Sequence, residues 1–122
     1  EIETLNLGLV GPRIEQDRVL FPEGVNVEFV HVRGTHDIRM RIWERGAGET
    51  LASGSGSCAA AVASIKRGFV ESPVNVHMSG GAVEVEWSGG GAPVLMSGPA
   101  EYVCEGRADK RLTSESQSLW RK

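Results

Sequence analysis

The sequence contains little cysteine and no long apolar run, and both absences restrict what the chain can be. Its 122 residues include only two cysteines, Cys58 and Cys104, which are too few for a disulfide framework. The most apolar predicted helix has roughly seven apolar residues between positions 58 and 65, whereas a membrane-spanning helix needs about 20. No secretory signal is visible either. We therefore expect a cytoplasmic protein with no membrane partner.

Clustered basic residues and metal-binding motifs are also absent. The net charge is −3 and the basic residues are scattered, which argues against nucleic acid as the main partner. His31, His36 and His77 have no recognised ligand spacing and there is no CxxC motif, so we expect no metal site. The length fits one domain, which we place at residues 1–106. The polar tail, residues 107–122, is expected to be disordered.

Glycine is abundant, and the 16 glycines separate short apolar runs that indicate strands. A short amphipathic helix is predicted at residues 2–10, closed by Gly11-Pro12. In the first strand, Val25, Val27 and Phe29 are predicted on one face, with Asn26 and Glu28 on the other. The first two predicted strands form a hairpin, and Gly80-Gly81 is a two-residue hairpin signal between the third and the fourth. The predicted strands are 25–32, 38–42, 74–78, 83–87, 94–97 and 100–105.

The most informative stretch is residues 44–68, ERGAGETLASGSGSCAAAVASIKRG. A predicted strand ends just before it, and the glycine-serine run 53–57 leads into good helix formers. The first N–H groups of a helix lack internal partners and carry partial positive charge. The run therefore predicts a binding site for a carboxylate or a phosphate. A flexible connector is the alternative, because glycine-serine runs are often linkers. Neither GxxxxGK[ST] nor GxSxG fits the run, which excludes a Walker loop and a nucleophile elbow.

The helix that follows is apolar on all sides from Cys58 to Ile65, which predicts that it is buried all round, in the middle of a curled sheet. The expected class is α+β, with about six strands around this helix. Cys58 is most simply a small buried apolar side chain. Glu44 and Arg45 form either an exposed salt-bridged pair or, beside the anion site, a carboxylate-binding group. Asn26 has no diagnostic value by itself.

Several motifs together resemble the C-terminal half of the diaminopimelate epimerase family. They are NVEF (26–29), WERGAGET (43–50), ASGSGSCAA (52–60), SGG (79–81) and MSGPA (96–100). The resemblance runs from about residue 2 to residue 105. The chain also begins with Glu1 rather than Met. Both observations favour a fragment or a processed chain.

The resemblance implies two similar domains, each a mixed β-barrel around a central helix, with the active site between them. It implies a pyridoxal-phosphate-independent isomerase that needs no metal. This enzyme interconverts LL- and meso-diaminopimelate in lysine biosynthesis by proton transfer at the α-carbon. Two cysteines, one from each domain, act as the acid and the base.

The resemblance also assigns roles to residues of this chain. Gly54 and Ser55 match residues whose backbone holds the α-carboxylate. Asn26, Glu44 and Arg45 match residues that bind the distal amino and carboxylate groups. Ser53 stands where the family has its catalytic cysteine, and Cys58 matches a second cysteine that we interpret as structural. A hydroxyl is a far weaker acid than a thiol, so Ser53 is not expected to provide the family's thiolate.

The other half-site is missing from these residues, so we predict that the chain alone does not epimerise diaminopimelate. The half-domain could be supplied in trans. The cleft side should then expose an apolar patch, which could also allow a homodimer. Two alternatives remain open: a degenerate module for amino-acid binding or assembly, and part of an isomerase or dehydratase similar to proline racemase. The ERGAGET block favours diaminopimelate over proline.

Overall fold

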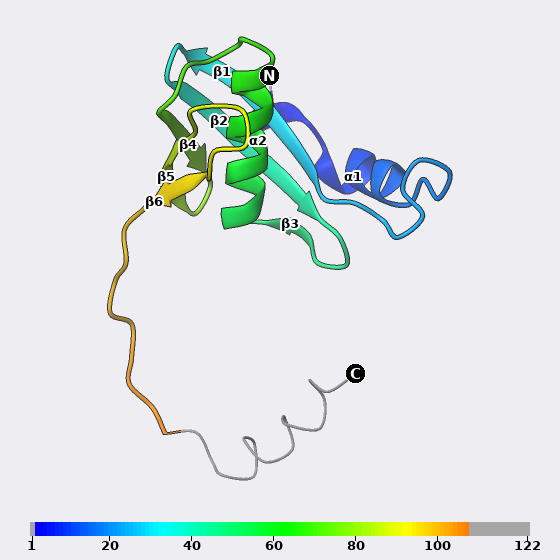
Figure 1. Cartoon of the computed structure of the whole chain (residues 1–122). Helices are drawn as coiled ribbons and strands as arrows, with labels where there is room; N and C mark the ends of the chain where they lie inside the picture. The colour runs from blue at the N-terminus through cyan, green and yellow to red at the C-terminus, as the bar shows by residue number, and fades with distance from the viewer. Residues whose placement is uncertain (1, 108–122) are drawn as a thin grey trace.

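A computed structural model of the chain describes residues 2–107 (Figure 1). Its elements, in chain order, are η1 (Ile2–Thr4), α1 (Leu7–Glu15), β1 (Val27–Gly34), β2 (Asp37–Glu44), β3 (Gly48–Thr50), α2 (Gly54–Lys66), β4 (Val74–Met78), β5 (Gly81–Glu86) and β6 (Leu95–Ser97). The predicted α+β class is confirmed. The disorder predicted for the tail concerns residues 108–122, which lie outside the described part.

The six strands form one mixed sheet with the order β1-β2-β4-β5-β6, and β3 pairs with β2. All neighbours are antiparallel except β2 and β4, which run parallel and are connected through β3 and α2. Within residues 2–107, β1 and β6 end the sheet and do not pair with each other. The sheet is therefore open, and the closed barrel that the resemblance implies is not formed by this part of the chain.

Helix α2 lies across one face of the sheet, as the green helix in Figure 1 shows. Its inward side carries Ala60 and Ala61, whose small side chains allow a close approach to the strands. The prediction that α2 is buried on all sides is wrong, because Ala59 and Ala63 are exposed. An open sheet covers only one side of a helix, so its opposite side remains uncovered.

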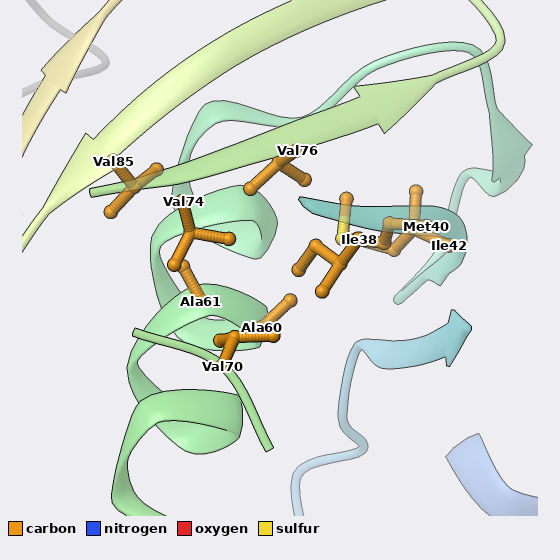
Figure 2. Close-up of a cluster of buried hydrophobic side chains, with 9 residues drawn as sticks. All are labelled: Ile38, Met40, Ile42, Ala60, Ala61, Val70, Val74, Val76 and Val85. Carbon is orange, nitrogen blue, oxygen red and sulfur yellow. The ribbon is translucent and has the colours of Figure 1, made fainter. Parts of the chain in front are cut away.

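The core forms between α2 and the sheet, and Figure 2 shows its side chains. The alternation predicted for the second strand is confirmed, because Ile38, Met40 and Ile42 are fully buried and point toward α2. Valines from the following elements complete the cluster with the two helical alanines. Its members are Ile38, Met40, Ile42, Ala60, Ala61, Val70, Val74, Val76 and Val85.

Helix α1 packs against β1, β2 and β3 on the other face of the sheet. The sequence predicted a helix at 2–10 that ends before Pro12, but α1 continues through Pro12 to Glu15, after a separate 3-10 turn. Pro12 removes one helical hydrogen bond. Packing explains the extension: Leu7 is buried, and a Cβ on Gly11 would lie only 2.4 Å from the Trp43 ring. These contacts outweigh a local signal to stop the helix.

The first strand begins two residues later than predicted, because Asn26 precedes β1 and bonds to the β2–β3 turn. Val30 pairs with Met40 and packs against the core, whereas Val27 and Phe29 pair with Trp43 and Arg41 on the α1 face. The predicted apolar face therefore faces α1, and Glu28 shares the α2 face with Val30.

Three further predictions need correction. The turn between β4 and β5 is Ser79-Gly80, one position earlier than predicted, since Gly81 already pairs with Met78. No strand forms at residues 100–105, where Tyr102 and Val103 are exposed and the chain leaves the sheet (Figure 1). Instead the short strand β3, which was not predicted, pairs with the end of β2. Apolar residues in sequence therefore do not by themselves make a strand, which also needs pairing with a neighbouring strand.

Candidate functional site

The site begins at the first turn of α2, where Ser53 caps the helix. Ser53 has extended backbone geometry (φ −151°, ψ 118°), and its Oγ accepts a hydrogen bond from the Gly56 N–H at 3.3 Å. Ser is a favoured N-cap residue because its short side chain reaches a backbone donor in this way. The N–H groups of Gly54 and Ser55 have no partner among residues 2–107. The loop is thus shaped as a helix start rather than as a flexible connector.

Gly56 is the closely packed glycine of this turn. A Cβ on Gly56 would lie 2.7 Å from Ile42 Cδ1, 3.1 Å from Ser53 Oγ and 3.2 Å from Glu28 Oε1. Glycine therefore allows the helix start to approach β1 and β2. Gly54, in contrast, is exposed and adjoins Met96 of β6, whose Cε lies 3.2 Å from its Cβ position.

Ser57 fixes the helix start from inside. It is fully buried, and its Oγ donates to the Ser53 carbonyl at 2.7 Å and contacts Met78 Sδ at 3.2 Å. The Ser53 N–H also points to Met78 Sδ, at 3.4 Å. Nothing in the sequence distinguishes Ser57 from the other serines of the run, because its partner Met78 lies on β4.

Glu44 and Arg45 lie at the turn between β2 and β3, and they do not form the salt-bridged pair that composition suggested. Glu44 Oε1 accepts a hydrogen bond from Thr50 Oγ1 at 2.6 Å. Arg45 is exposed and donates from Nη1 to the Glu23 carbonyl at 2.9 Å. The backbone N–H of Arg45 donates to Asn26 Oδ1 at 2.8 Å, so that Asn26 and this turn are brought together.

Glu28, on β1, lies close to the first turn of α2. It was not among the site residues predicted from the sequence. One of its carboxyl oxygens lies 3.2 Å from the position that a Cβ on Gly56 would take, and the carboxyl is hydrogen-bonded to the backbone of Glu28 itself. Burial raises the pKa of Glu28, and the nearby Glu44 carboxylate raises it further. The sequence signal that could have identified Glu28 is the alternation of the first strand, which places residue 28 on the same face as the candidate residue Asn26.

The two cysteines are free. Cys58 is half-buried and packs against the core, one helical turn beyond Ser53. Its position agrees with the interpretation as an apolar side chain. Cys104 is exposed in the segment after β6.

No part of residues 2–107 holds three His, Cys, Asp or Glu side chains in an arrangement that could bind a metal ion. His36 Nδ1 lies within 3.0 Å of the carbonyls of Glu71 and Pro73, and His77 Nε2 lies 3.0 Å from Asp37 Oδ2. His31 is exposed on β1. Across the same residues, no helix is both long and apolar enough to cross a membrane.

A groove of about 410 Å³ lies between β1 and the uncovered side of α2, with Glu28 among its lining residues. Val30, Val32, Ala59 and Ala63 give it an apolar floor, and Phe69 is 60% exposed beside it. The groove follows from the open sheet, since β1 has no further strand at its outer edge in the described part. The groove is partly apolar, and whether it belongs to the cleft side, where an apolar patch was predicted, stays a prediction.

Comparison with known proteins identifies the family. Residues 1–103 match the family described as "Diaminopimelate epimerase". The chain belongs to the diaminopimelate epimerase family. Ser53 and the turn at Glu44 and Arg45 both lie within the matched region.

Curated relatives named "Diaminopimelate epimerase" are about half identical to the chain. The chain is 48% identical to the protein of Pseudomonas entomophila (strain L48) over 107 residues, which cover 88% of the chain and 38% of that relative. It is 54% identical to the protein of Ralstonia nicotianae and 52% identical to that of Cupriavidus necator, each over 99 residues, 81% of the chain and 34% of the relative. The chain thus spans little more than a third of the length of the curated relatives it matches.

Proposed function

We propose that this chain forms one half of the substrate site of a cofactor-independent diaminopimelate epimerase. The observation that supports this most directly is the pair of unpartnered N–H groups at Gly54 and Ser55, next to a capped Ser53, in a member of this family. Such groups stabilise a carboxylate, and also the negative charge that develops when an α-proton leaves. The reaction would interconvert LL- and meso-diaminopimelate in lysine biosynthesis.

Each candidate residue has a role in this proposal. Gly54 and Ser55 hold the α-carboxylate through their backbone N–H groups. Glu44 accepts from the distal ammonium group, and Arg45 binds the distal carboxylate with its guanidinium group. Asn26 uses its Oδ1 to hold the Arg45 N–H, which leaves its amide NH2 group to donate to the substrate.

The serine at position 53 limits the chemistry of this half. A cysteine at a helix N-terminus has a lowered pKa and can act as a thiolate, whereas a serine hydroxyl has no comparable acidity. Ser53 Oγ also already accepts the Gly56 N–H. We therefore propose that the chain alone binds diaminopimelate but does not epimerise it.

A partner half would complete the site. The relatives are almost three times as long as the matched segment, and the groove between β1 and α2 offers an apolar surface for the additional polypeptide. We propose that an N-terminal half supplied in trans binds there, and that a second copy of this chain can occupy the same groove in its absence.

An amino-acid-binding or assembly module without catalytic activity is the second candidate. The serine at position 53 favours this candidate, because it caps the helix but lacks the thiol that the family uses for proton transfer. This module would keep the roles of Asn26, Arg45 and the helix start in binding.

Incubation with LL-diaminopimelate in D2O tests the proposal, with deuterium at the α-carbon read by mass spectrometry and binding by NMR titration in the same sample. We expect binding without exchange. Exchange by the unaltered chain would show that Ser53 or another group ionises the substrate, and absence of binding would contradict the proposed site.

The variant Ser53→Cys sharpens the test, because it restores the family's thiol at the helix start. We expect it to exchange the α-proton where the unaltered chain does not. Its control is Ser53→Cys combined with Cys58→Ala, which must keep the exchange if the new thiol is responsible.

A further inference from the structure

Glu15 joins α1 to the turn that carries Glu44 and Arg45. Its Oε2 accepts a hydrogen bond from Trp43 Nε1 at 2.8 Å, and its Oε1 accepts from the Gly46 N–H at 3.2 Å. One carboxylate thus binds the residues on both sides of the Glu44–Arg45 pair. Hydrogen bonds to an ionised group are stronger than those between neutral groups.

The helix presents Glu15 to this turn through a close contact one turn earlier. Gly11 and Glu15 are four residues apart, so they lie on the same side of α1. The Cβ position of Gly11 is 2.4 Å from Trp43 Cγ and Cδ2, which shows that the helix backbone packs directly on the indole ring. Any larger residue at position 11 would move Glu15 away from both of its donors.

The turn that carries Glu44 and Arg45 is held by hydrogen bonds to residues outside it. Gly46 and Gly48 have φ values of +75° and +83°, which only glycine adopts readily. Because glycine is conformationally permissive, the shape of this turn depends on the hydrogen bonds that the turn makes with its surroundings. Here the Arg45 N–H bonds to Asn26 and the next N–H, at Gly46, bonds to Glu15.

We propose that Glu15 is a positioning residue for the distal end of the substrate site. This proposal rests on the proposed function, which assigns Glu44 and Arg45 to the distal ammonium and carboxylate of the substrate. Glu15 approaches the turn from the α1 face, whereas the α-carboxylate site lies at α2 on the other face of the sheet (Figure 1). Loss of Glu15 should therefore weaken recognition of the distal end and leave the helix start unchanged.

The test compares two ligands and two variants. Glu15→Gln keeps one acceptor oxygen and loses the other. Glu84→Gln is the matched control, since Glu84 is exposed on β5 and its side chain makes no hydrogen bond in the described part. Binding is measured by NMR titration with diaminopimelate and with 2-aminoheptanoate, which lacks the distal groups. We expect Glu15→Gln to weaken diaminopimelate binding about tenfold and to leave 2-aminoheptanoate binding within twofold. Glu84→Gln should change neither.

Equal weakening for both ligands, or no change for either, would overturn the proposal. If the unaltered chain binds neither ligand, the proposed function fails, and the role of Glu15 is then judged on the turn alone. In that case amide hydrogen exchange at Gly46 and the Trp43 indole N–H resonance are compared between the chain and Glu15→Gln. Faster exchange and a shifted indole resonance support the positioning role, and unchanged values overturn it.

Discussion

The two faces of the β1–β2 hairpin are stabilised in different ways. On the α2 face, Ile38, Met40 and Ile42 are fully buried among apolar side chains. On the α1 face, the alternate residues Arg39, Arg41 and Trp43 all donate hydrogen bonds to acceptors on other elements. Apolar burial is non-directional, whereas hydrogen bonds fix orientation. The fold therefore obtains its stability mainly from one face, and the shape of the Glu44–Arg45 turn from the other.

Arg41 shows how specific the α1 face is. Its Nη1 donates to the carbonyls of Ile2 and Leu5, and its Nε and Nη2 contact Glu49 Oε1 at 2.8 Å. One guanidinium group thus ties η1 and the start of α1 to β3. The side chains of the core cluster, all of them apolar, make no hydrogen bond of this directional kind in the described part of the chain.

Ile38→Ala, on the α2 face, should have the largest effect. Ile38 has no exposed surface, and truncation of a buried Ile typically costs about 2–5 kcal/mol of unfolding free energy. Chemical denaturation followed by circular dichroism measures the loss. Val32→Ala is the control, since Val32 is 40% exposed at the groove and should cost much less. Similar losses at both positions would mean that the α2 face does not hold the core.

Gly11→Ala comes next and tests the α1 face. The new Cβ would overlap the Trp43 ring, and overpacking of this kind costs about 1–3 kcal/mol. We expect a lower melting temperature and altered Trp fluorescence. Gly8→Ala is the matched control on the same helix: its nearest neighbour is Asn6 Oδ1 at 3.4 Å, so it should be neutral or slightly stabilising. A neutral Gly11→Ala would contradict the close packing of α1 on Trp43.

Ser53→Ala should have a smaller effect, limited to the start of α2. It removes the cap on the Gly56 N–H, which costs about 1 kcal/mol. Denaturation measures the cost, and amide exchange at Gly56 locates it. Ser55→Ala serves as the control, because Ser55 is exposed and its side chain caps nothing in the described part. An unchanged Gly56 exchange rate would show that Ser53 is not the cap.

Glu28→Gln should have the smallest effect and a distinct pH dependence. The folded-state pKa of Glu28 lies above its ordinary value of 4.5, because of burial and then of Glu44. Its contribution to stability is therefore complete below the ordinary pKa and is lost as the pH rises through the raised pKa. Glu28→Gln should remove this part of the pH dependence and be slightly more stable at neutral pH. Denaturation between pH 4 and 7, with Glu84→Gln as control, measures the difference.

Sequence patterns predicted the β1–β2 hairpin and the buried face of β2, but they did not show which face of β1 packs on the core. The β2 residues alternate cleanly between apolar and charged types, because only one of its faces packs on the core. Strand β1 carries Val27 and Phe29 on the α1 face and Val30 on the α2 face, so alternation could not distinguish the inner side. A strand that carries apolar residues on both faces loses the pattern on which such predictions depend.

The residues of the candidate site were also predictable only in part. The helix start at Ser53 was predictable, because a glycine-serine run followed by helix formers is a local signal. Glu15 and Ser57 were not predicted, since Trp43 and Met78, which they contact, lie on other elements. Glu28 was not predicted because its proximity to Gly56 depends on how α2 packs on β1. The continuation of α1 through Pro12 and the absence of a strand at 100–105 have the same origin: each depends on which other element is available for packing.

The parallel pairing of β2 with β4 has a consequence for the order of folding events. The β1–β2 and β4–β5 hairpins each join neighbouring segments, and contacts of this local kind form quickly. Parallel pairing of Ile38 with Val76 can form only after β3 and α2 have crossed between the two hairpins. We therefore expect docking of the two hairpins on α2 to be slower than formation of either hairpin, which stopped-flow refolding would measure.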